Sequence, residues 1–371
     1  MNHIVYMRRA LELAEMGWGY TNPNPLVGAV IVKDNQIIAE GYHAELGGDH
    51  AEVAAFSHTA RDLRGATLYV NLEPCSHYGR MPPCAEAIIK KGIQEVVVSM
   101  TDPNPRVAGC GISMLKQAGI NVTVGVLESE ARKLNEIFIK YITTDRPFVI
   151  MKTAMTLDGK IASVTGDSKW ISGEASRQSV HWLRQRVGAI MVGSGTICRD
   201  NPALTTRLAS GKGKDPMRVI IDSRGVIPLD CEAIAGESEA RVLLATTTQI
   251  DPYKEETLIK MGVQVIKADG IGRHVDLKSL MRTLHALEVD SILLEGGGRL
   301  NTAAIGAGIV DKLMIFVAPK IIGGKEAVTP VEGQGIPLMQ DAISIDNIHV
   351  SQSGMDVLIE GYLKGDLCLQ G

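Results

Sequence analysis

The chain has 371 residues, of which 45% are hydrophobic and 22% are charged, and its formal net charge is −4. This composition is ordinary for a globular protein, and the length predicts two or three domains of about 150 residues each. The acidic balance argues against a nucleic-acid-binding surface, and six cysteines are too few for a disulfide framework. We therefore expect a cytoplasmic protein that acts on small molecules, with neither nucleic acid nor a membrane as its partner.

The first half of the chain alternates helix-like and strand-like segments. Residues 1–20 place apolar side chains between charged ones, which predicts an amphipathic helix and not a secretion signal. Short apolar runs predict strands at 27–32, 67–71, 95–100 and 122–126, and a helical spacing follows over 128–141. The polar run at 143–147 ends this helix, so we expect two domains, residues 1–145 and 146–371.

One imidazole and two thiols in the first domain form a candidate metal site. His50, Cys75 and Cys84 supply three ligands that suit a tetrahedral Zn²⁺ and leave its fourth position open to water. Glu52 stands close enough in the sequence to move protons without binding the metal, which is the pattern of zinc deaminases. The motif therefore predicts a hydrolytic deamination, with Glu52 as the catalytic acid and base.

Local sequence supports these ligands. A polar loop at 47–49 gives way to a helix start at His50, and two prolines place Cys84 at the start of a helix over 85–90, where the helix dipole favours a thiolate. Two alternatives stay open: a structural zinc whose fourth ligand is His43 or His77, or three unrelated residues. Eight residues separate the cysteines, which excludes a strict cytidine- or adenosine-deaminase pattern with two.

The second half repeats the alternation and suggests a mostly parallel sheet covered by helices. Strands are predicted at residues 148–151, 189–192, 218–221, 242–245, 263–266, 291–294 and 312–318, and residues 211–216 are predicted to form a loop. Residues 291–301 combine a strand, three glycines and a helix start. This arrangement can bring backbone amides against the phosphates of a dinucleotide, although a glycine run also makes a turn for many other reasons.

Several motifs together resemble one enzyme family. They are residues 22–28 (NPNPLVG), 72–80 (LEPCSHYGR) with 82–84 (PPC), 152–160 (KTAMTLDGK), 166–172 (GDSKWIS) and 200–205 (DNPALT). The whole chain is similar to the bifunctional deaminase/reductase of riboflavin biosynthesis, and Met81 falls where we expect Thr in such relatives. The resemblance implies an α/β protein with an N-terminal cytidine-deaminase-like α/β/α domain and a C-terminal dihydrofolate-reductase-like α/β domain.

The resemblance also implies two successive reactions. The first domain would deaminate 2,5-diamino-6-(5-phosphoribosylamino)pyrimidin-4(3H)-one with Zn²⁺, and the second would reduce the ribose to a ribityl chain with NADPH. The implied pocket residues of the first domain are Asn24, His43, His77, Arg80, Asp102 and Asn104. The polar residues next to proline are explained about equally well by a plain turn.

In the second domain the resemblance implies contacts to substrate and cofactor. The substrate contacts are Ser168, Arg184, Leu204, Arg207 and Glu295, and the planar fork of arginine suits a ribose phosphate. The cofactor contacts are Ala154, Trp170, Thr196, Asp200, Ser223, Gly297, Gly298, Arg299, Leu300 and Asn301. Ser223 and Arg224 could meet the 2′-phosphate of NADPH, and a strand-end turn explains them equally well.

Two charged residues are candidates for the reduction itself. Lys152 and Asp200 could orient the sugar or protonate its ring oxygen as hydride reaches C1′. A lysine that reaches solvent from a strand end, and an N-cap aspartate before Asn201, explain them at least as well.

A rival function is a nucleic-acid-editing deaminase whose second half binds RNA. Only 4% of the residues are aromatic and the charge balance is acidic, which argues against this function. The strand at 310–318 is predicted to be exposed, and together with the resemblance it suggests a homo-oligomer formed through the second domain.

Overall fold

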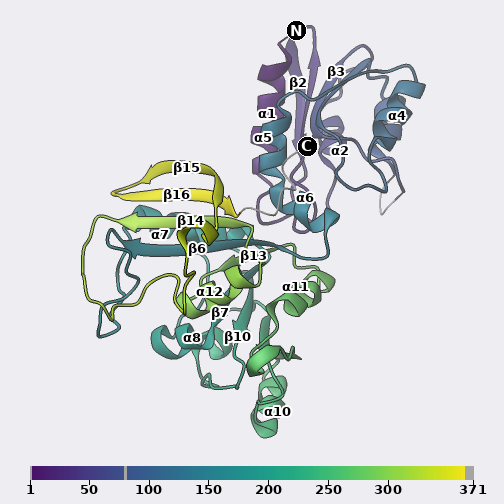
Figure 1. The fold of residues 1–371 in the computed structure, drawn as a ribbon. Coiled ribbons are helices and arrows are strands. Elements are labelled where there is room, and N and C mark those ends of the chain that lie inside the picture. Colours follow the sequence, from purple (N-terminus) through teal and green to yellow (C-terminus); the bar gives the residue numbers. More distant parts are fainter. Residues whose placement is uncertain (1, 79–81, 364–371) are drawn as a thin grey trace. The chain divides into compact units, whose positions relative to one another are not determined.

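The computed structural model describes residues 2–78 and 82–363. Within these residues the chain forms two compact units, residues 2–144 and 145–363, and each is described by itself (Figure 1). In this part of the chain, no helix combines the length and the apolar character that crossing a membrane requires.

The first unit is built on a sheet whose described strands lie in the order β2-β1-β3-β4-β5. β1 pairs antiparallel with β2 and β3, whereas β3, β4 and β5 are parallel. The strands are β1 (Gly28–Lys33), β2 (Gln36–Tyr42), β3 (Thr67–Leu72), β4 (Glu95–Met100) and β5 (Asn121–Val124), and the helices are α1 (His3–Glu15), α2 (Ala51–Ser57), α3 (Cys84–Lys90), α4 (Cys110–Gln117), α5 (Glu128–Leu134) and α6 (Glu136–Thr143).

Helices cover both faces of this sheet. Successive side chains of a strand point to opposite faces, and here both sets are apolar. Leu68 and Val70 of β3 belong to the core that includes residues of α2, α3 and α4. Tyr69, between them, packs in the core that includes Met7 and Ala10 of α1. With both faces buried, β3 and β4 are nearly continuous apolar runs, and the expected α/β/α layering is confirmed.

The single helix expected over 128–141 is wrong, because the chain forms two helices that meet at Asn135. The backbone of Asn135 (φ −101°, ψ 20°) leaves the helical region. Its side-chain oxygen accepts from the Leu26 N–H at 2.8 Å, and its amide donates to the Leu26 carbonyl at 3.0 Å. The helix is therefore interrupted where Asn135 makes a long-range contact, and helical periodicity cannot reveal such a contact.

The second unit contains a larger sheet, whose described strands lie in the order β12-β11-β10-β7-β13-β6-β14-β16-β15. All pairs are parallel up to β14, and β16 and β15 extend the sheet as an antiparallel hairpin. The strands are β6 (Phe148–Thr156), β7 (Ala189–Gly193), β10 (Met217–Ile221), β11 (Val242–Thr246), β12 (Gln264–Lys267), β13 (Ser291–Leu294), β14 (Lys312–Ala318), β15 (Ile345–Ser353) and β16 (Asp356–Leu363).

Helices pack on both faces of this sheet as well. One core joins Val149 of β6 and Met191 of β7 to Leu280 of α11, and another joins Ile190 and Ile220 to helices on the opposite face. The helices are α7 (Glu174–Arg186), α8 (Ser194–Asp200), α9 (Glu232–Ala235), α10 (Pro252–Lys260), α11 (Leu277–Ala286) and α12 (Gly298–Gly306). The mostly parallel sheet is therefore confirmed.

Two expectations for the second unit are wrong. Residues 211–216 are not only a loop, because β9 (Gly211–Lys212) pairs with β8 (Arg207–Leu208). The strand over 310–318 is not exposed, because β14 lies between β6 and β16 and buries Leu313 and Phe316. The β15–β16 hairpin, which no sequence pattern predicted, covers this side of β14.

The hairpin also fixes the start of α7. The N-cap residue of this helix is Gly173, which has no side chain to cap it. Asp356, at the start of β16, accepts instead from the Gly173 N–H at 2.7 Å and from the Ser176 hydroxyl at 2.6 Å. A carboxylate at a helix N-terminus is stabilising, so the C-terminal hairpin sets the position of α7.

Candidate active sites

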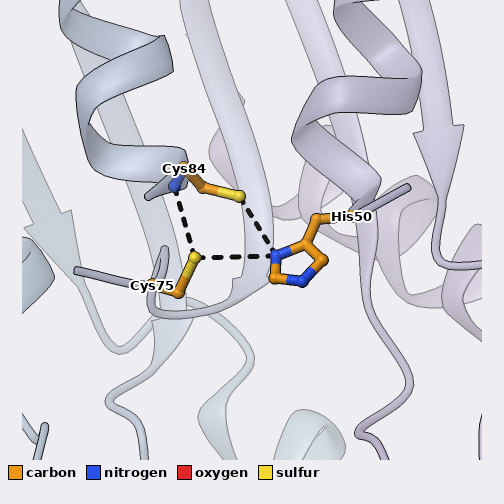
Figure 2. A group of neighbouring side chains, drawn as sticks. All are labelled: His50, Cys75 and Cys84. Atoms are coloured by element: carbon orange, nitrogen blue, oxygen red, sulfur yellow. Dashed lines mark hydrogen bonds between the residues drawn. The ribbon is translucent and has the colours of Figure 1, made fainter. Parts of the chain in front are cut away.

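Three side chains of the first unit meet where two helices begin. His50 is the N-cap residue of α2, Cys84 is the first residue of α3, and Cys75 lies in the segment after β3. The Nδ1 atom of His50 lies 3.2 Å from the Sγ atom of Cys84 and 3.6 Å from that of Cys75. Figure 2 shows the same ring nitrogen facing both sulfurs.

The two thiols differ in their electrostatics. The hydrogen bond with the Cys84 thiol, together with that of His50 and the Cys84 backbone N–H at 3.2 Å, lowers the pKa of Cys75 to about 4. The same bond and burial raise the pKa of Cys84. The hydrogen bond to Cys75 raises the pKa of His50.

The donor set fits zinc. The three ligand atoms lie within 4.8 Å of one another, and a nitrogen and a sulfur on one tetrahedral zinc are roughly 3.6 Å apart. The structural-zinc alternative needs a fourth side-chain ligand, and no other His, Cys, Asp or Glu of the described residues joins the group. The two ring nitrogens of His43 are already bonded, and His77 is exposed.

Glu52 lies beside this group on the first turn of α2. It is 3% exposed, and it stands two residues after His50. Burial raises the pKa of its carboxyl group. The arrangement therefore holds a proton-carrying group next to the three ligands, as the spacing of His50 and Glu52 suggested.

His43 and Asn24 form a second pair near the ligands. The Nδ1 atom of His43 bonds the Asp49 carbonyl at 2.9 Å, so it carries the proton, and Nε2 accepts from the Asn24 amide at 3.2 Å. The His43 ring lies edge-on to His50 with the ring centres 5.8 Å apart. The structure thus brings Asn24, His43 and His50 together, and burial lowers the pKa of His43.

The expected turn at 102–105 is present, and two of its side chains form hydrogen bonds with backbone N–H groups in or next to it. Asp102 accepts from the Asn104 N–H at 2.8 Å, and Asn104 accepts from the Arg106 N–H at 3.1 Å. Burial raises the pKa of Asp102, and the charges of His77 and Cys75 act on its carboxyl group. Asp102 is thus close to the ligand group. Arg80 and Met81 lie outside the described residues.

In the second unit, a buried carboxylate gathers two cations. Glu295, directly after β13, receives two hydrogen bonds from the Arg184 guanidinium, at 2.7 and 3.1 Å. The Lys152 ammonium lies 3.8 Å from the same carboxylate. Burial opposes the charge of Glu295, but Arg184 and Lys152 outweigh it and lower its pKa to about 2.

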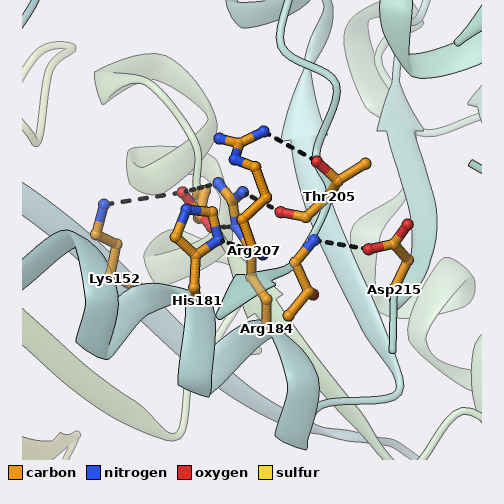
Figure 3. Close-up of polar contacts among 8 residues, drawn as sticks. Lys152, His181, Arg184, Thr205, Arg207 and Asp215 are labelled. Atoms are coloured by element: carbon orange, nitrogen blue, oxygen red, sulfur yellow. Dashed lines mark hydrogen bonds and ion pairs between the residues drawn. The ribbon is translucent and has the colours of Figure 1, made fainter. Parts of the chain in front are cut away.

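Further polar groups surround Arg184 (Figure 3). Its third hydrogen bond goes to the Thr205 carbonyl at 2.9 Å, and Arg207 donates to the Thr205 hydroxyl at 3.0 Å. The Nδ1 atom of His181 accepts from the Arg207 N–H at 3.2 Å. Burial and the two arginines lower the pKa of His181 to about 4. Arg184 is thus occupied by protein partners, whereas Arg207 is exposed.

A cavity of about 380 Å³ adjoins this group and is lined by Thr205, Arg207, Asp215 and Ser238 among others. A cavity of about 540 Å³ in the first unit lies elsewhere, between α1 and β2, and includes none of the three ligand residues. The site of the first unit is therefore identified by its three ligand residues and not by the size of a cavity.

The alternative explanations for Lys152 and Asp200 are both wrong. Lys152 lies inside β6 and pairs with Glu295, so it does not reach solvent from a strand end. Asp200 is the last residue of α8 and not an N-cap, and Asn201 follows with φ 41°. None of the ion pairs of the described residues joins Asp200 to Lys152.

The glycine turn has the expected form. β13 ends at Leu294, and Gly297 is the N-cap residue of α12. No atom lies within 4 Å of the position that a Gly297 Cβ would take, and the buried Asn301 Oδ1 has no partner. Open backbone at a helix N-terminus fits a cofactor phosphate. The Asn301 amide, however, donates to the Pro330 carbonyl at 2.9 Å.

The remaining predicted residues lie on several elements of the second unit. Ala154 lies on β6 and Thr196 on α8, while Ser168, Arg299 and Leu300 are at least partly exposed. Trp170 is exposed and stacks on Arg177, whereas the Leu204 side chain is buried in the core. Gly298 is buried at the start of α12. Ser223 accepts from the Val275 N–H at 3.2 Å, within a strand-end turn.

Two residues of these sites, His181 and Glu73, were not predicted from the sequence. His181 stands three positions before Arg184 on one helix, and this spacing could have indicated it. Glu73, which follows β3, bonds backbone groups 29 to 39 residues away, and no sequence pattern announces such contacts.

Each of the two units matches a known protein family. Residues 1–100 match the family model of the cytidine and deoxycytidylate deaminase zinc-binding region, and residues 147–359 match that of the RibD C-terminal domain. The riboflavin biosynthesis protein RibD of Actinobacillus pleuropneumoniae is 46% identical over 97% of this chain and 95% of its own. The chain belongs to the RibD family.

Solved structures agree with this membership. RibD of Acinetobacter baumannii is 37% identical with a TM-score of 0.87, and the alignment covers 97% of this chain and 98% of that one. A diaminohydroxyphosphoribosylaminopyrimidine deaminase/5-amino-6-(5-phosphoribosylamino)uracil reductase of Thermotoga maritima is 40% identical with a TM-score of 0.83 and the same coverage. The resemblance found in the sequence motifs is thereby confirmed.

This RibD family member is a bifunctional enzyme of riboflavin biosynthesis, with a deaminase and a reductase activity. Its deaminase domain is cytidine-deaminase-like and binds zinc, and its second domain is the reductase domain of the family. The rival editing function is therefore excluded.

Proposed function

We propose that residues 1–145 deaminate 2,5-diamino-6-(5-phosphoribosylamino)pyrimidin-4(3H)-one and that residues 146–371 then reduce its ribose to a ribityl phosphate chain with NADPH. The observation that carries this proposal is the His50, Cys75 and Cys84 group with Glu52 beside it. The printed name of the Thermotoga maritima relative gives the same pair of reactions.

In the deaminase domain, His50, Cys75 and Cys84 hold the zinc. When bound, zinc supplies a Lewis acid that makes water acidic near neutral pH. Glu52 takes a proton from the attacking water and delivers it to the departing amine, so a C–O bond forms, a C–N bond breaks and ammonia leaves. Asn24, His43, His77, Asp102 and Asn104 line the pocket, and Arg80 belongs to it by resemblance.

Zinc removal tests this assignment. We expect Cys84→Ser to lower the zinc content of the purified chain from about one ion to nearly none and to abolish ammonia release, because the site loses a thiolate ligand. Reduction of pre-deaminated substrate should persist. Cys110→Ser, an exposed cysteine of the same unit, is the matched control. A Cys84→Ser chain that keeps both zinc and deamination would overturn the ligand set.

In the reductase domain, the proposal is supported by the buried cluster of Lys152, Arg184 and Glu295, which lies beside Arg207. Arg207 binds the ribose phosphate, and Arg184 and Glu295 position Lys152 toward the sugar, with Ser168 and Leu204 nearby. Leu204 contributes through its backbone, because its side chain lies in the core. Lys152 and Asp200 orient the sugar or protonate its ring oxygen as hydride arrives.

The proposed cofactor contacts also belong to the reductase domain. NADPH, when bound, supplies the hydride. The glycine turn at Gly297 and Gly298 holds its phosphate through backbone amides, and Ser223 favours the 2′-phosphate. The other contacts are Ala154, Trp170, Thr196, Asp200, Arg299, Leu300 and Asn301.

We infer that the enzyme self-associates through the reductase domain. β15 is an edge strand of the described sheet, and Val350 on it is 59% exposed, with Ile345, Ile348 and Met355 also exposed. An edge strand that exposes apolar side chains favours pairing with a second copy. Light scattering should give twice the chain mass for the native protein and the single mass for Val350→Asp. A native monomer at working concentration would refute this.

A cytoplasmic location is also part of the proposal. The five cysteines of the described residues are free, as expected in a reducing compartment. Cell fractionation should recover the enzyme with cytoplasmic markers.

A further inference from the structure

Glu73 is a buried carboxylate between the ligand Cys75 and the end of β3. It is 5% exposed, and its backbone N–H continues the sheet by donating to the Met100 carbonyl at 3.0 Å. Its carboxylate accepts three backbone N–H groups: those of Asp102 at 3.1 Å and Gly109 at 2.9 Å on Oε2, and that of Ile112 at 3.1 Å on Oε1. Three donors on one carboxylate fix it firmly.

Two of these donors belong to the start of α4. Gly109 is the N-cap residue of this helix, with φ 76° and no side chain to accept a hydrogen bond. Glu73 therefore caps α4 from another part of the chain, where a negative charge is favoured. The first turn of α4 also touches the metal-ligand segment, because a Cβ at Gly111 would lie 2.0 Å from the Pro74 carbonyl oxygen.

The third donor belongs to the turn that carries Asp102 and Asn104. Glu73 stands two residues before Cys75, and its Oε2 atom accepts from the Asp102 N–H at 3.1 Å, so this turn lies beside the segment that carries Cys75. One carboxylate thus joins the segment of Cys75, the turn at Asp102 and the start of α4. The close approach of Gly111 to Pro74 and the Glu73–Met100 backbone hydrogen bond hold the same segments together.

We propose that Glu73 is a positioning residue for deamination, which holds the Asp102–Asn104 turn at a fixed place relative to Cys75. The proposal rests on the proposed function of Asp102 as a pocket residue. The Glu73 carboxylate is bonded to three backbone N–H groups and is not one of the three ligand residues, so its substitution should weaken substrate binding through the turn and leave the ligands in place.

Glu73→Gln tests this role. The amide replaces one oxygen by an NH₂ donor, which then faces a backbone N–H. We expect the KM for the diaminopyrimidinone phosphate to rise roughly tenfold, the size expected for one lost charge-assisted hydrogen bond, with a smaller change in kcat. Zinc content and the reductase activity of the same chain should be unchanged. Glu130→Gln, exposed on α5, is the matched control.

A double-mutant cycle with Asp102→Asn separates positioning from general support of the fold. If Glu73 acts only by positioning Asp102, the two effects on KM should not multiply. In the Asp102→Asn chain the contact of the Asp102 carboxylate with substrate is already absent, so Glu73→Gln has little left to weaken. Effects that multiply fully, a KM within twofold of native, or loss of zinc would each overturn the proposal. If Glu73→Gln does not fold, Glu73→Asp, which is one methylene shorter, should raise KM in the same direction.

The same cycle distinguishes two failures. If Asp102→Asn leaves the KM unchanged, the proposed pocket is wrong, and the role of Glu73 falls with it. If Asp102→Asn raises the KM and Glu73→Gln does not, only the inference about Glu73 is wrong.

Discussion

Glu52→Gln should reduce the rate of ammonia release by about 10²- to 10⁴-fold, which is the usual contribution of a positioned acid and base. The substitution keeps the size of the side chain and its place on α2, but the amide cannot accept the proton of water. Because Glu52 is 3% exposed, bulk water cannot easily replace it. The measurement is ammonia release from the diaminopyrimidinone phosphate, with zinc content determined on the same sample.

The control lies in the other activity of the chain. NADPH oxidation on pre-deaminated substrate should proceed at the native rate in Glu52→Gln, and Glu45→Gln, an exposed glutamate of the same domain, should leave both rates unchanged. If Glu52→Gln also abolished reduction, the model of two separate sites would be wrong.

Glu295→Gln should have the largest effect on the reductase domain. The substitution leaves Arg184 and Lys152 in a buried place without their counter-charge, and the side chains of Arg184 and Glu295 are both 13% exposed. Loss of one partner of such a group lowers the free energy of unfolding by roughly 3 kcal/mol. Denaturant unfolding should show this loss, and NADPH oxidation should fall with it.

A surface ion pair provides the matched control. Glu256 pairs with Lys260 on α10 at 2.7 Å, but the two side chains are 63% and 72% exposed. Glu256→Gln should change the free energy of unfolding by less than about 1 kcal/mol, because solvent screens the pair. Equal losses in the two variants would contradict the view that the Glu295 group is a buried ion pair.

The Glu295 effect should also depend on pH in a defined direction. The pKa of Glu295 is lowered from 4.5 to about 2, so its charge contributes stability that is fully present above pH 4.5. That contribution is lost as the pH falls from 4.5 toward 2. The difference in stability between the native chain and Glu295→Gln should therefore shrink across this window and stay constant from pH 5 to 7.

The sequence revealed most of what depends on local pattern. The strands at Glu95–Met100, Ser291–Leu294 and Lys312–Ala318 have the predicted bounds, because buried strands are short apolar runs between turn residues. His50, Cys75 and Cys84 could be named because zinc restricts its ligands to a few residue types, and the turn and helix-start signals around them are local.

What the sequence hid depends on contacts between distant residues. Asn135 divides a periodic helix by bonding Leu26, 109 residues before it. Glu295 lies next to the predicted glycine turn, but its bond to Arg184 spans 111 residues. The hairpin of β15 and β16 carries many exposed side chains, so it lacks the apolar run that marks a buried strand.

The strand order of the second sheet bears on how this enzyme is made. β6, which comes first in that unit, lies between β13 and β14, which come more than 130 residues later. The nascent reductase domain therefore exposes an unpaired central strand until residues 291–318 have left the ribosome, whereas the described deaminase sheet is complete once residue 124 has emerged. Chaperone dependence during translation should accordingly concentrate in the later part of the chain.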